Sequence, residues 1–387
     1  KGFIAHGDEV AIVDLVEVRD IAGASALLQR QRPADLVFSI NIFGAYKDDK
    51  GRTVSDLVDA PHVVAYGDYP LAHLSRILGM PRSSAILTAD PSHIRVIDSF
   101  FGAGYFAYVG FNPGVATGEP RPLPATADEF LSARPTPILC PMSYYVPPPP
   151  PWREYPNEMK KVFTAAAEFA LAEEWVPPLE ALDHALIADG LDFSDPRLKK
   201  DLAVVRTLAN ELNGWIRFVR RERFFAAAAK VGLPLTVYGN GYDGVLDRYP
   251  NIDYRGTGDA YATPDLMAKS RIVISHNSNF GEGIHERVPT AMVAGAVAAT
   301  DTSAYYREHY AAGEDIALYR WQHLEEDLAG IRDLLADGEK LFRMAKAGQK
   351  KALAQDRWQN RIEIVLAAAR AAADRRAAER TALCDRA

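Results

Sequence analysis

Apolar runs of four or five residues alternate with helix-like segments along the first 115 residues of the chain. The runs are rich in β-branched and aromatic residues, which favours strands, and they occupy residues 10–13, 36–40, 63–66, 85–88 and 105–109. Helices are predicted between several of these strands, for example at residues 21–31 and 71–78. Strand and helix in alternation predict a parallel sheet with crossover helices.

The chain begins with a segment typical of the end of a helix, followed by a glycine turn and the run at 10–13. Open α/β domains usually begin with a strand, and no strand precedes this helix. We therefore expect the first strand of the domain to lie upstream of Lys1 in the natural protein.

A second set of alternating elements follows a Pro- and Ala-rich connection at residues 116–136. Its predicted strands are 137–142, 235–238, 252–254, 272–274 and 296–299, and its predicted helices include 264–269 and the region after 338. Residues 157–230 look mostly helical, which is more than a single crossover needs. We therefore expect an inserted helical subdomain within this second domain.

The segment 271–301 reads RIVISHNSNFGEGIHERVPTAMVAGAVAATD. A polar loop follows its first strand, a helix is expected from near Ile284, and a second strand ends at Asp301, which is typical of a β-α-β unit. Ligands of doubly wound sheets bind beyond the carboxyl ends of the strands, where helix N-termini offer free N–H groups to phosphate. The sequence therefore predicts a pyrophosphate site where the chain bends around Phe280.

The polar groups of this loop suit a nucleotide-diphosphate sugar. Gly281 and Gly283 can bring backbone N–H groups against a diphosphate, and Arg287 can neutralise its charge. Carboxylates can accept hydrogen bonds from sugar hydroxyls. The candidate residues of the loop are Asn277, Ser278, Asn279, Gly281, Glu282, Gly283, His285, Glu286 and Arg287. Helix capping is the alternative interpretation for the small polar residues.

A glycine pair follows the strand predicted at 235–238, and it adds Tyr238, Gly239, Asn240 and Gly241 to the candidate nucleotide-binding residues. Glycine lets a backbone approach a ligand closely. A tight turn explains these residues equally well. The third glycine of the dinucleotide fingerprint is missing, so a nicotinamide dehydrogenase is not expected.

Three side chains that can act as general bases follow predicted strands of the first domain: Asp68, Asp90 and His93. The alternative is that the two aspartates cap helices or brace turns before proline. The basic aromatic segment at 215–225 presents a similar choice. Its arginines can reach phosphate, but the pattern favours a solvated face of an amphipathic helix.

Composition narrows the classes of function. The formal net charge of −7 argues against a general nucleic-acid binder. Cys140 and Cys384 lack zinc or redox spacing, and Pro289 stands where a metalloprotease HExxH motif needs its second histidine, so no metal site is predicted. No apolar stretch approaches the roughly 20 residues of a membrane span, and no signal peptide is visible, so a soluble cytoplasmic protein is expected.

Three stretches together resemble glycosyltransferases of the GT-B fold, namely YGNGY with IDYRGTG, the 271–301 segment, and DRWQNRIEIVLAA near the end. The branch they resemble has a C-terminal domain of the "glycosyl transferases group 1" family and an N-terminal domain akin to spore-maturation-type proteins. The resemblance implies an α/β protein with two Rossmann-like domains facing an interdomain cleft. The C-terminal domain would hold the nucleotide sugar and the N-terminal domain the acceptor. Transfer in this fold does not usually need a bound metal, and no other cofactor is expected.

The resemblance also implies the domain boundaries. An acceptor-side domain is expected at 1–115, a linker at 116–136, and the nucleotide-sugar domain at 137–357 with its helical insertion at about 157–230. The last helix, 358–387, is expected to pack back on the N-terminal domain.

The chain departs from the family pattern at Thr290, where many relatives carry a glutamate that binds the nucleotide ribose. Threonine offers a hydroxyl but no charge, so a different ribose contact, another donor preference and loss of catalysis are the alternatives. Glu282, eight residues earlier, matches the spacing of the first glutamate of the paired-Glu motif in retaining relatives. It is a candidate sugar contact.

The leading interpretation is a glycosyltransferase that moves a sugar from a nucleotide-diphosphate donor to a hydroxyl of a sugar, a lipid-linked glycan or a protein. A nucleotide-sugar 2-epimerase shares the architecture, and a non-catalytic member that binds a nucleotide or a partner is the third interpretation. The sequence leaves open the donor sugar, the nucleobase, the acceptor, the stereochemical outcome and the oligomeric state.

Overall fold

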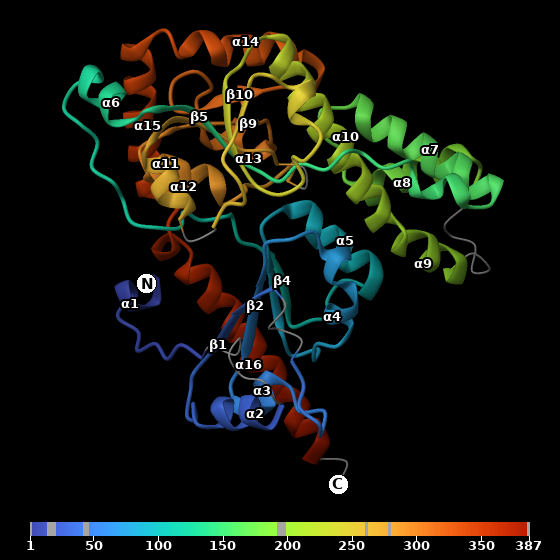
Figure 1. The fold of residues 1–387 in the computed structure, drawn as a ribbon. Helices are drawn as coiled ribbons and strands as arrows, with labels where there is room; N and C mark the ends of the chain where they lie inside the picture. The colour runs from blue at the N-terminus through green and yellow to red at the C-terminus, as the bar shows by residue number, and fades with distance from the viewer. Residues whose placement is uncertain are drawn as a thin grey trace. The chain divides into compact units, whose positions relative to one another are not determined.

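The computed structural model describes residues 2–13, 21–41, 46–191, 199–259, 262–277 and 280–384. The chain divides into two compact units. The N-terminal unit contains residues 1–114 and 357–387, and the C-terminal unit contains residues 115–356. Each unit is built around its own parallel sheet (Figure 1). The prediction of an α/β protein with two Rossmann-like units is confirmed.

The sheet of the N-terminal unit has four parallel strands in the order β1-β2-β3-β4. The strands are β1 (Val37–Ile40), β2 (His62–Tyr66), β3 (Ala85–Thr88) and β4 (Tyr108–Phe111). The helices before and between them are α2 (Ile21–Gln29), α3 (Val54–Val58), η2 (Pro70–His73), α4 (Leu74–Leu78) and α5 (Pro91–Phe101). Both faces of β2 and β3 are covered, which explains why these strands are continuous apolar runs.

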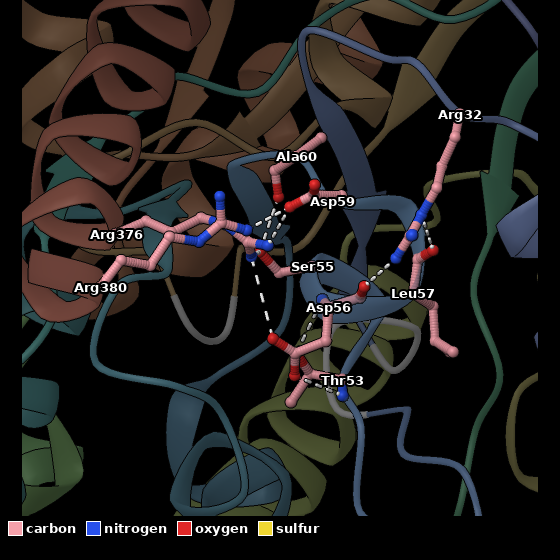
Figure 2. Close-up of polar contacts among 9 residues, drawn as sticks. All are labelled: Arg32, Thr53, Ser55, Asp56, Leu57, Asp59, Ala60, Arg376 and Arg380. Atoms are coloured by element: carbon pink, nitrogen blue, oxygen red, sulfur yellow. Dashed lines mark hydrogen bonds and ion pairs between the residues drawn. The ribbon is translucent and has the colours of Figure 1, made fainter. Parts of the chain in front are cut away.

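The long last helix, α16 (Ile362–Cys384), packs against β2, β3 and β4 of the same unit. It buries Val365, Ala368 and Ala372 on the sheet, and the small alanine side chains allow a close approach. Figure 2 shows how its far end is fastened to α3. Arg376 donates to Asp59 at 2.7 Å, and Arg380 donates to the same carboxylate. These hydrogen bonds, with that from Arg380 the stronger, lower the pKa of Asp59.

Two strands of the N-terminal unit differ from the prediction. Residues 10–13 follow α1 (Gly2–His6) but form no strand, and Ile12 is 90% exposed. An apolar run becomes a strand only where a neighbouring strand supplies its hydrogen bonds, and no strand of the described residues pairs with this run. The last strand lies three residues later than expected, because Tyr108–Phe111 rather than 105–109 pairs with β3.

The C-terminal unit contains a six-stranded parallel sheet in the order β10-β9-β8-β5-β6-β7. Its strands are β5 (Thr136–Pro141), β6 (Leu235–Tyr238), β7 (Ile252–Tyr254), β8 (Ser270–Ile274), β9 (Val297–Asp301) and β10 (Ala317–Tyr319). From β5 the sheet continues to β6 and β7 on one side, and from β8 it continues to β9 and β10 on the other. The strand order therefore reverses between β5 and β8, at the centre of the sheet.

Helices α7 (Asn157–Ala172), α8 (Pro178–Ala188), α9 (Lys199–Thr207) and α10 (Ala209–Lys230) separate β5 from β6. α10 is the crossover helix, since Phe224 and Phe225 are fully buried in the core of the sheet. α7 and α8 pack against each other, within the range in which a helical insertion is predicted (Figure 1).

The remaining α-helices of this unit are α6 (Ala127–Ala133), α11 (Thr263–Ala268), α12 (Arg287–Val293), α13 (Ala304–His309), α14 (Leu324–Leu334) and α15 (Gly338–Gln355). Its short 3-10 turns include η3 (Pro151–Glu154), η5 (Leu246–Arg248) and η6 (Trp321–His323). The chain then returns to the N-terminal unit through η7 (Trp358–Asn360). Within the described ranges, no helix has both the length and the apolar content to cross a bilayer.

Candidate functional site

The carboxyl ends of β5 and β8 lie side by side at the point where the strand order reverses. In doubly wound sheets this switch point opens a crevice in which ligands bind. Ser143 lies just beyond the end of β5, and Ser275, His276 and Asn277 follow β8 directly. The structure therefore places the polar loop predicted from the sequence at the position where this fold binds ligands.

Three consecutive residues at the end of β8 bury polar atoms that have no hydrogen-bond partner among the described residues. The atoms are Ser275 Oγ, both ring nitrogens of His276, and the amide oxygen and nitrogen of the Asn277 side chain. The residues are 1%, 4% and 1% exposed, respectively. Leaving a buried polar group unpaired costs about 1–3 kcal/mol, and folded proteins rarely do so. These atoms therefore indicate a polar partner that is not among the described residues.

The charges of four arginines act on His276, and we call these residues the arginine cluster: Arg217, Arg220, Arg221 and Arg287. The first three lie on α10 and the last begins α12. Burial lowers the pKa of His276 well below its usual value, and the positive charges of all four arginines lower it further. His276 is therefore neutral, and the surroundings of the unpaired atoms favour an anion.

Two arginines of the cluster are left with capacity to bind a ligand. Arg221 donates from one guanidinium nitrogen to the carbonyl oxygen of Ser143 at 2.8 Å, while its Nε is buried without a partner among the described residues. Burial, followed by the charges of Arg217 and Arg287, lowers the pKa of Arg221 to about 10. The guanidinium of Arg287 has no hydrogen bond or ion pair within the described part of the chain. An anion bound near these like charges would relieve their mutual repulsion.

The guanidinium of Arg220 makes its hydrogen bonds within the protein. It is 3% exposed, and its guanidinium donates to the carbonyl oxygens of Ala170 at 2.9 Å and Glu173 at 3.1 Å. It also lies over the ring of Trp321, 5.2 Å from the centroid. Arg220 thus fastens the end of α7 to the site.

Asp301, at the end of β9, supports the loop after β8. One carboxylate oxygen accepts from the backbone N–H of Asn277 at 2.6 Å, and the other accepts from the indole of Trp321 at 3.2 Å. Burial raises the pKa of Asp301 to about 6, although these hydrogen bonds and nearby Arg220 oppose the shift. The sequence marked Asp301 only as the end of a strand.

The glycine bend packs against other parts of the C-terminal unit. Phe280 is only 5% exposed, and a Cβ on Gly281 would overlap the indole of Trp175, which comes from the α7–α8 connection. The carbonyl oxygens of Gly281, Glu282 and Gly283 bind the first residues of α13, with Ala304 N at 2.9 Å, Tyr305 N at 3.1 Å and Ser303 Oγ at 2.7 Å. These contacts use the carbonyl oxygens and not the N–H groups assigned to the phosphate, so the pyrophosphate site at this bend stays a prediction.

The helix after the loop also starts later than predicted, at Arg287 rather than near Ile284. Its first N–H groups are already bonded. Arg287 N donates to Nδ1 of His285 at 3.2 Å, and Val288 N donates to the His285 carbonyl oxygen at 3.1 Å. The first two N–H groups of α12 are thus used within the protein. Glu286 is exposed beside His285, and Ser278 and Asn279 lie outside the described residues.

Thr290 is 3% exposed, and its hydroxyl is used within the protein. The hydroxyl donates to the carbonyl oxygen of Glu286 at 2.6 Å and accepts from the backbone N–H of Thr117 at 2.9 Å. The hydroxyl considered as a ribose contact therefore fastens the segment before α6 to α12.

The glycine pair after β6 is explained by contact with another part of the chain. A Cβ on Gly239 would come within 2.7 Å of the backbone at Met142 and Ser143, and one on Gly241 would overlap the carbonyl oxygen of Tyr144. Asn240 is exposed at the tip, and Tyr238 is half-buried. Because Arg221 binds the same Ser143, this turn adjoins the arginine cluster.

The three candidate bases of the N-terminal unit occupy different environments. Asp90 is fully buried and caps α5, with one carboxylate oxygen accepting from Ser92 N at 2.8 Å, so the capping interpretation is correct for it. His93 is fully buried against Tyr69, with the ring centroids 5.3 Å apart. Asp68 is the exposed one of the three, with 59% of its side chain accessible.

Sequence reasoning missed the inward-facing arginines of α10 and the role of His276. A signal for the arginines existed. Arg217, Arg220 and Arg221 stand at helical spacing from Phe224, which is buried, so they share its face. Within the described ranges, no three His, Cys, Asp or Glu side chains converge as a metal site would require.

Comparison with known proteins adds an independent observation. Residues 220–367 match the family described as "Glycosyl transferase-like". The matched segment contains Arg220, Arg221, the loop after β8 and α12. No curated protein matches the chain.

Many solved structures are similar to the chain at low identity. HepE from Anabaena, in complex with UDP and glucose, is 12% identical, with 94% of this chain and 88% of that chain covered and a TM-score of 0.47. Sucrose-phosphate synthase from Thermosynechococcus elongatus is 10% identical, with 96% and 81% covered and a TM-score of 0.46. TarM is 9% identical with a TM-score of 0.43; 80% of this chain is covered, and the chain spans about half, 55%, of TarM.

Proposed function

We propose that this protein transfers a sugar from a nucleotide-diphosphate donor to a hydroxyl acceptor. The observation that carries the proposal is the set of unpaired buried polar atoms at Ser275, His276 and Asn277 beside the arginine cluster. The match of residues 220–367 to a glycosyl transferase-like family supports it, because the match includes this set.

In this proposal the diphosphate lies between Arg221 and Arg287, beyond the ends of β5 and β8. Two guanidinium groups can balance the charge that develops on the diphosphate as its bond to the sugar breaks. They do the work that a divalent cation does in other transferases, so turnover is proposed to need no metal. Neutral His276 and the amide of Asn277 can donate hydrogen bonds to phosphate or sugar oxygens.

The neighbouring groups then take the other parts of the donor. The turn at Tyr238–Asn240 adjoins the arginine cluster and offers an aromatic ring and an exposed amide to a nucleobase. Glu282 remains the proposed sugar contact. The N-terminal unit, expected to resemble spore-maturation-type proteins, is proposed to hold the acceptor.

The test is calorimetry with UDP, GDP and ADP, followed by turnover of the corresponding nucleotide sugars in the presence and absence of EDTA. We expect one nucleoside diphosphate to bind, and its sugar to be consumed with release of that diphosphate in both conditions. Conversion of the donor to an epimer would assign the protein as an epimerase instead. Binding without consumption would assign a non-catalytic member, and absence of binding by every nucleotide would refute the proposal.

A further inference from the structure

The connection between α7 and α8 reaches the loop after β8, and the proposed donor site does not use it. It carries Trp175, whose indole lies against Gly281, so that a Cβ on the glycine would overlap Cδ2 and Cε3 of the ring. The hydrogen side chain of Gly281 therefore allows the ring to lie directly on the backbone of the bend. Glu282, the proposed sugar contact, is the next residue. The indole thus adjoins the part of the loop that is proposed to meet the sugar.

Hydrogen bonds hold the two residues before the indole in place. The carboxylate of Glu174 accepts from the backbone N–H of Trp321 at 2.8 Å and from that of Gln322 at 3.1 Å. Arg220 donates to the carbonyl oxygen of Glu173 at 3.1 Å. The indole that follows is therefore held in position before a ligand arrives, so little conformational entropy is lost when its ring makes a contact.

The same contacts connect the α7–α8 connection to the unpaired atoms after β8. The ring of Trp321, whose backbone N–H binds Glu174, lies 4.9 Å from the ring of His276. The guanidinium of Arg220 lies over the other side of this connection, 5.2 Å from the centroid of Trp321. The α7–α8 connection and the proposed donor site therefore belong to one packed arrangement within the C-terminal unit.

Trp175 differs from other tryptophans of the chain because its hydrogen-bond donor is unused. The indole N–H groups of Trp152, Trp215 and Trp321 each donate to an oxygen of the protein. The indole N–H of Trp175 has no hydrogen-bond partner within the described ranges, and the residue is half-buried. Tryptophan usually finds a partner for this group when it is buried. An N–H donor and part of an aromatic ring are therefore available to a ligand.

A pyranose ring matches both features of the indole. The C–H groups of the sugar gather on a face that packs against an aromatic ring, and its hydroxyls accept hydrogen bonds from an N–H group. A diphosphate, in contrast, is charged and has no apolar face. Trp175 therefore suits the sugar part of a nucleotide sugar rather than its phosphates.

We infer that Trp175 packs against the sugar of the donor and is a specificity-determining residue of the donor site. This inference rests on the proposed transferase function and assigns part of the sugar recognition to the α7–α8 connection. The indole stabilises the bound nucleotide sugar without contacting the nucleoside diphosphate. Removal of the indole should therefore weaken binding of the first ligand and leave binding of the second unchanged.

The experiment uses the full chain, with the nucleoside diphosphate that binds in the panel above and its nucleotide sugar as separate ligands. Both Kd values are measured by calorimetry without an acceptor. We expect Trp175→Ala to raise the Kd for the nucleotide sugar about 10-fold, as the loss of one aromatic contact would do. The Kd for the nucleoside diphosphate should stay within about two-fold of wild type.

Two further variants separate sugar recognition from a structural role. Trp175→Phe keeps an aromatic ring but loses the N–H group, so its Kd for the nucleotide sugar should lie between those of wild type and Trp175→Ala. It also keeps the test available if the alanine variant fails to fold. Trp215→Ala is the matched control, because Trp215 is a half-buried tryptophan whose N–H donates to the carbonyl oxygen of Pro148 at 3.0 Å. It should leave both Kd values unchanged.

Tryptophan fluorescence gives a second measurement. The emission of Trp175, taken as the difference between wild type and Trp175→Phe, should change when the nucleotide sugar binds. It should stay constant when the nucleoside diphosphate binds, because that ligand lacks the group that contacts the indole.

An unchanged Kd for the nucleotide sugar in both Trp175 variants would overturn the inference. An equal increase in both Kd values would also overturn it, because the indole would then contact the nucleotide or support the loop. Either result leaves nucleotide binding by the wild-type protein intact, so the proposed function would survive. Failure of the wild-type protein to bind any nucleotide would instead remove the proposed function and this inference together.

Discussion

Arg287→Ala is the sharpest perturbation of the proposed donor site. The guanidinium of Arg287 has no partner in the described part of the chain, so its removal breaks no hydrogen bond or ion pair seen in the structure. Its charge instead adds to the crowding that lowers the pKa of Arg221. The variant without nucleotide should therefore unfold at the same temperature as wild type or slightly above it.

Nucleotide binding, in contrast, should become weaker in Arg287→Ala. A charge-assisted hydrogen bond to phosphate contributes about 1.5–3 kcal/mol, so its loss should raise Kd about 10- to 150-fold. A nucleotide concentration of about 1,000 times the wild-type Kd stabilises wild type by about 4 kcal/mol. A variant with a 100-fold higher Kd gains only about 1.4 kcal/mol under the same conditions. The difference corresponds to about 5–10 °C in the melting temperature of the C-terminal unit.

The assay is calorimetry together with thermal unfolding in the presence and absence of nucleotide. Arg223→Ala is the matched control, since Arg223 is an exposed arginine of α10 that donates to Leu171 O and lies outside the cluster. It should bind nucleotide within about two-fold of wild type, and Arg287→Lys should lie between the two. An Arg287→Ala variant with unchanged Kd, or one whose melting temperature without nucleotide falls by several degrees, would refute the reasoning.

Two further predictions concern the groups around the site. The raised pKa of Asp301 means that the folded state binds this proton more tightly than the unfolded chain does. The free energy of unfolding should therefore fall by roughly 3 kcal/mol as the pH rises from about 4 to about 6. Urea unfolding should show the stability of wild type relative to Asp301→Asn falling over this interval, and a constant difference would contradict the assignment. Gly281→Ala should cost about 1–3 kcal/mol through overlap with Trp175 and much less in a Trp175→Ala background; additive effects would show that the two residues are not in contact.

Much of the fold could be predicted from local pattern. Strands such as β3 and β8 are buried on both faces, so their apolar runs are continuous and stand out from the helices around them. The run at 10–13 looks the same in the sequence but forms no strand, because strand formation also depends on a neighbour that the pattern does not encode. Local pattern therefore predicts elements better than it predicts their pairing.

The sequence also predicts the location of the candidate site better than it predicts the contacts of the residues there. The sequence locates a polar segment at the end of β8. The structure adds that Gly281 packs against Trp175 and that the carbonyl oxygens of the bend bind the start of α13. Asp90 proved to be a helix cap, whereas Asp68 is exposed at its strand end. From one sequence alone, a glycine or an aspartate at such a position does not show whether it is needed to bind a ligand or to contact another part of the chain.

The sequence by itself determined the alternation of strands and helices, and hence two parallel sheets with polar residues following the strands. Only the tertiary structure decided that β8 pairs with β5 rather than with the strand before it, which brings Ser143, Arg221, His276 and Arg287 to one place. It also decided that Arg220 and Arg221 of α10 face inward. The physical reason is that periodicity records whether a position is buried, which is a local property. The partner that buries it is selected by packing between segments that can lie far apart in the sequence, as β5 and β8 do.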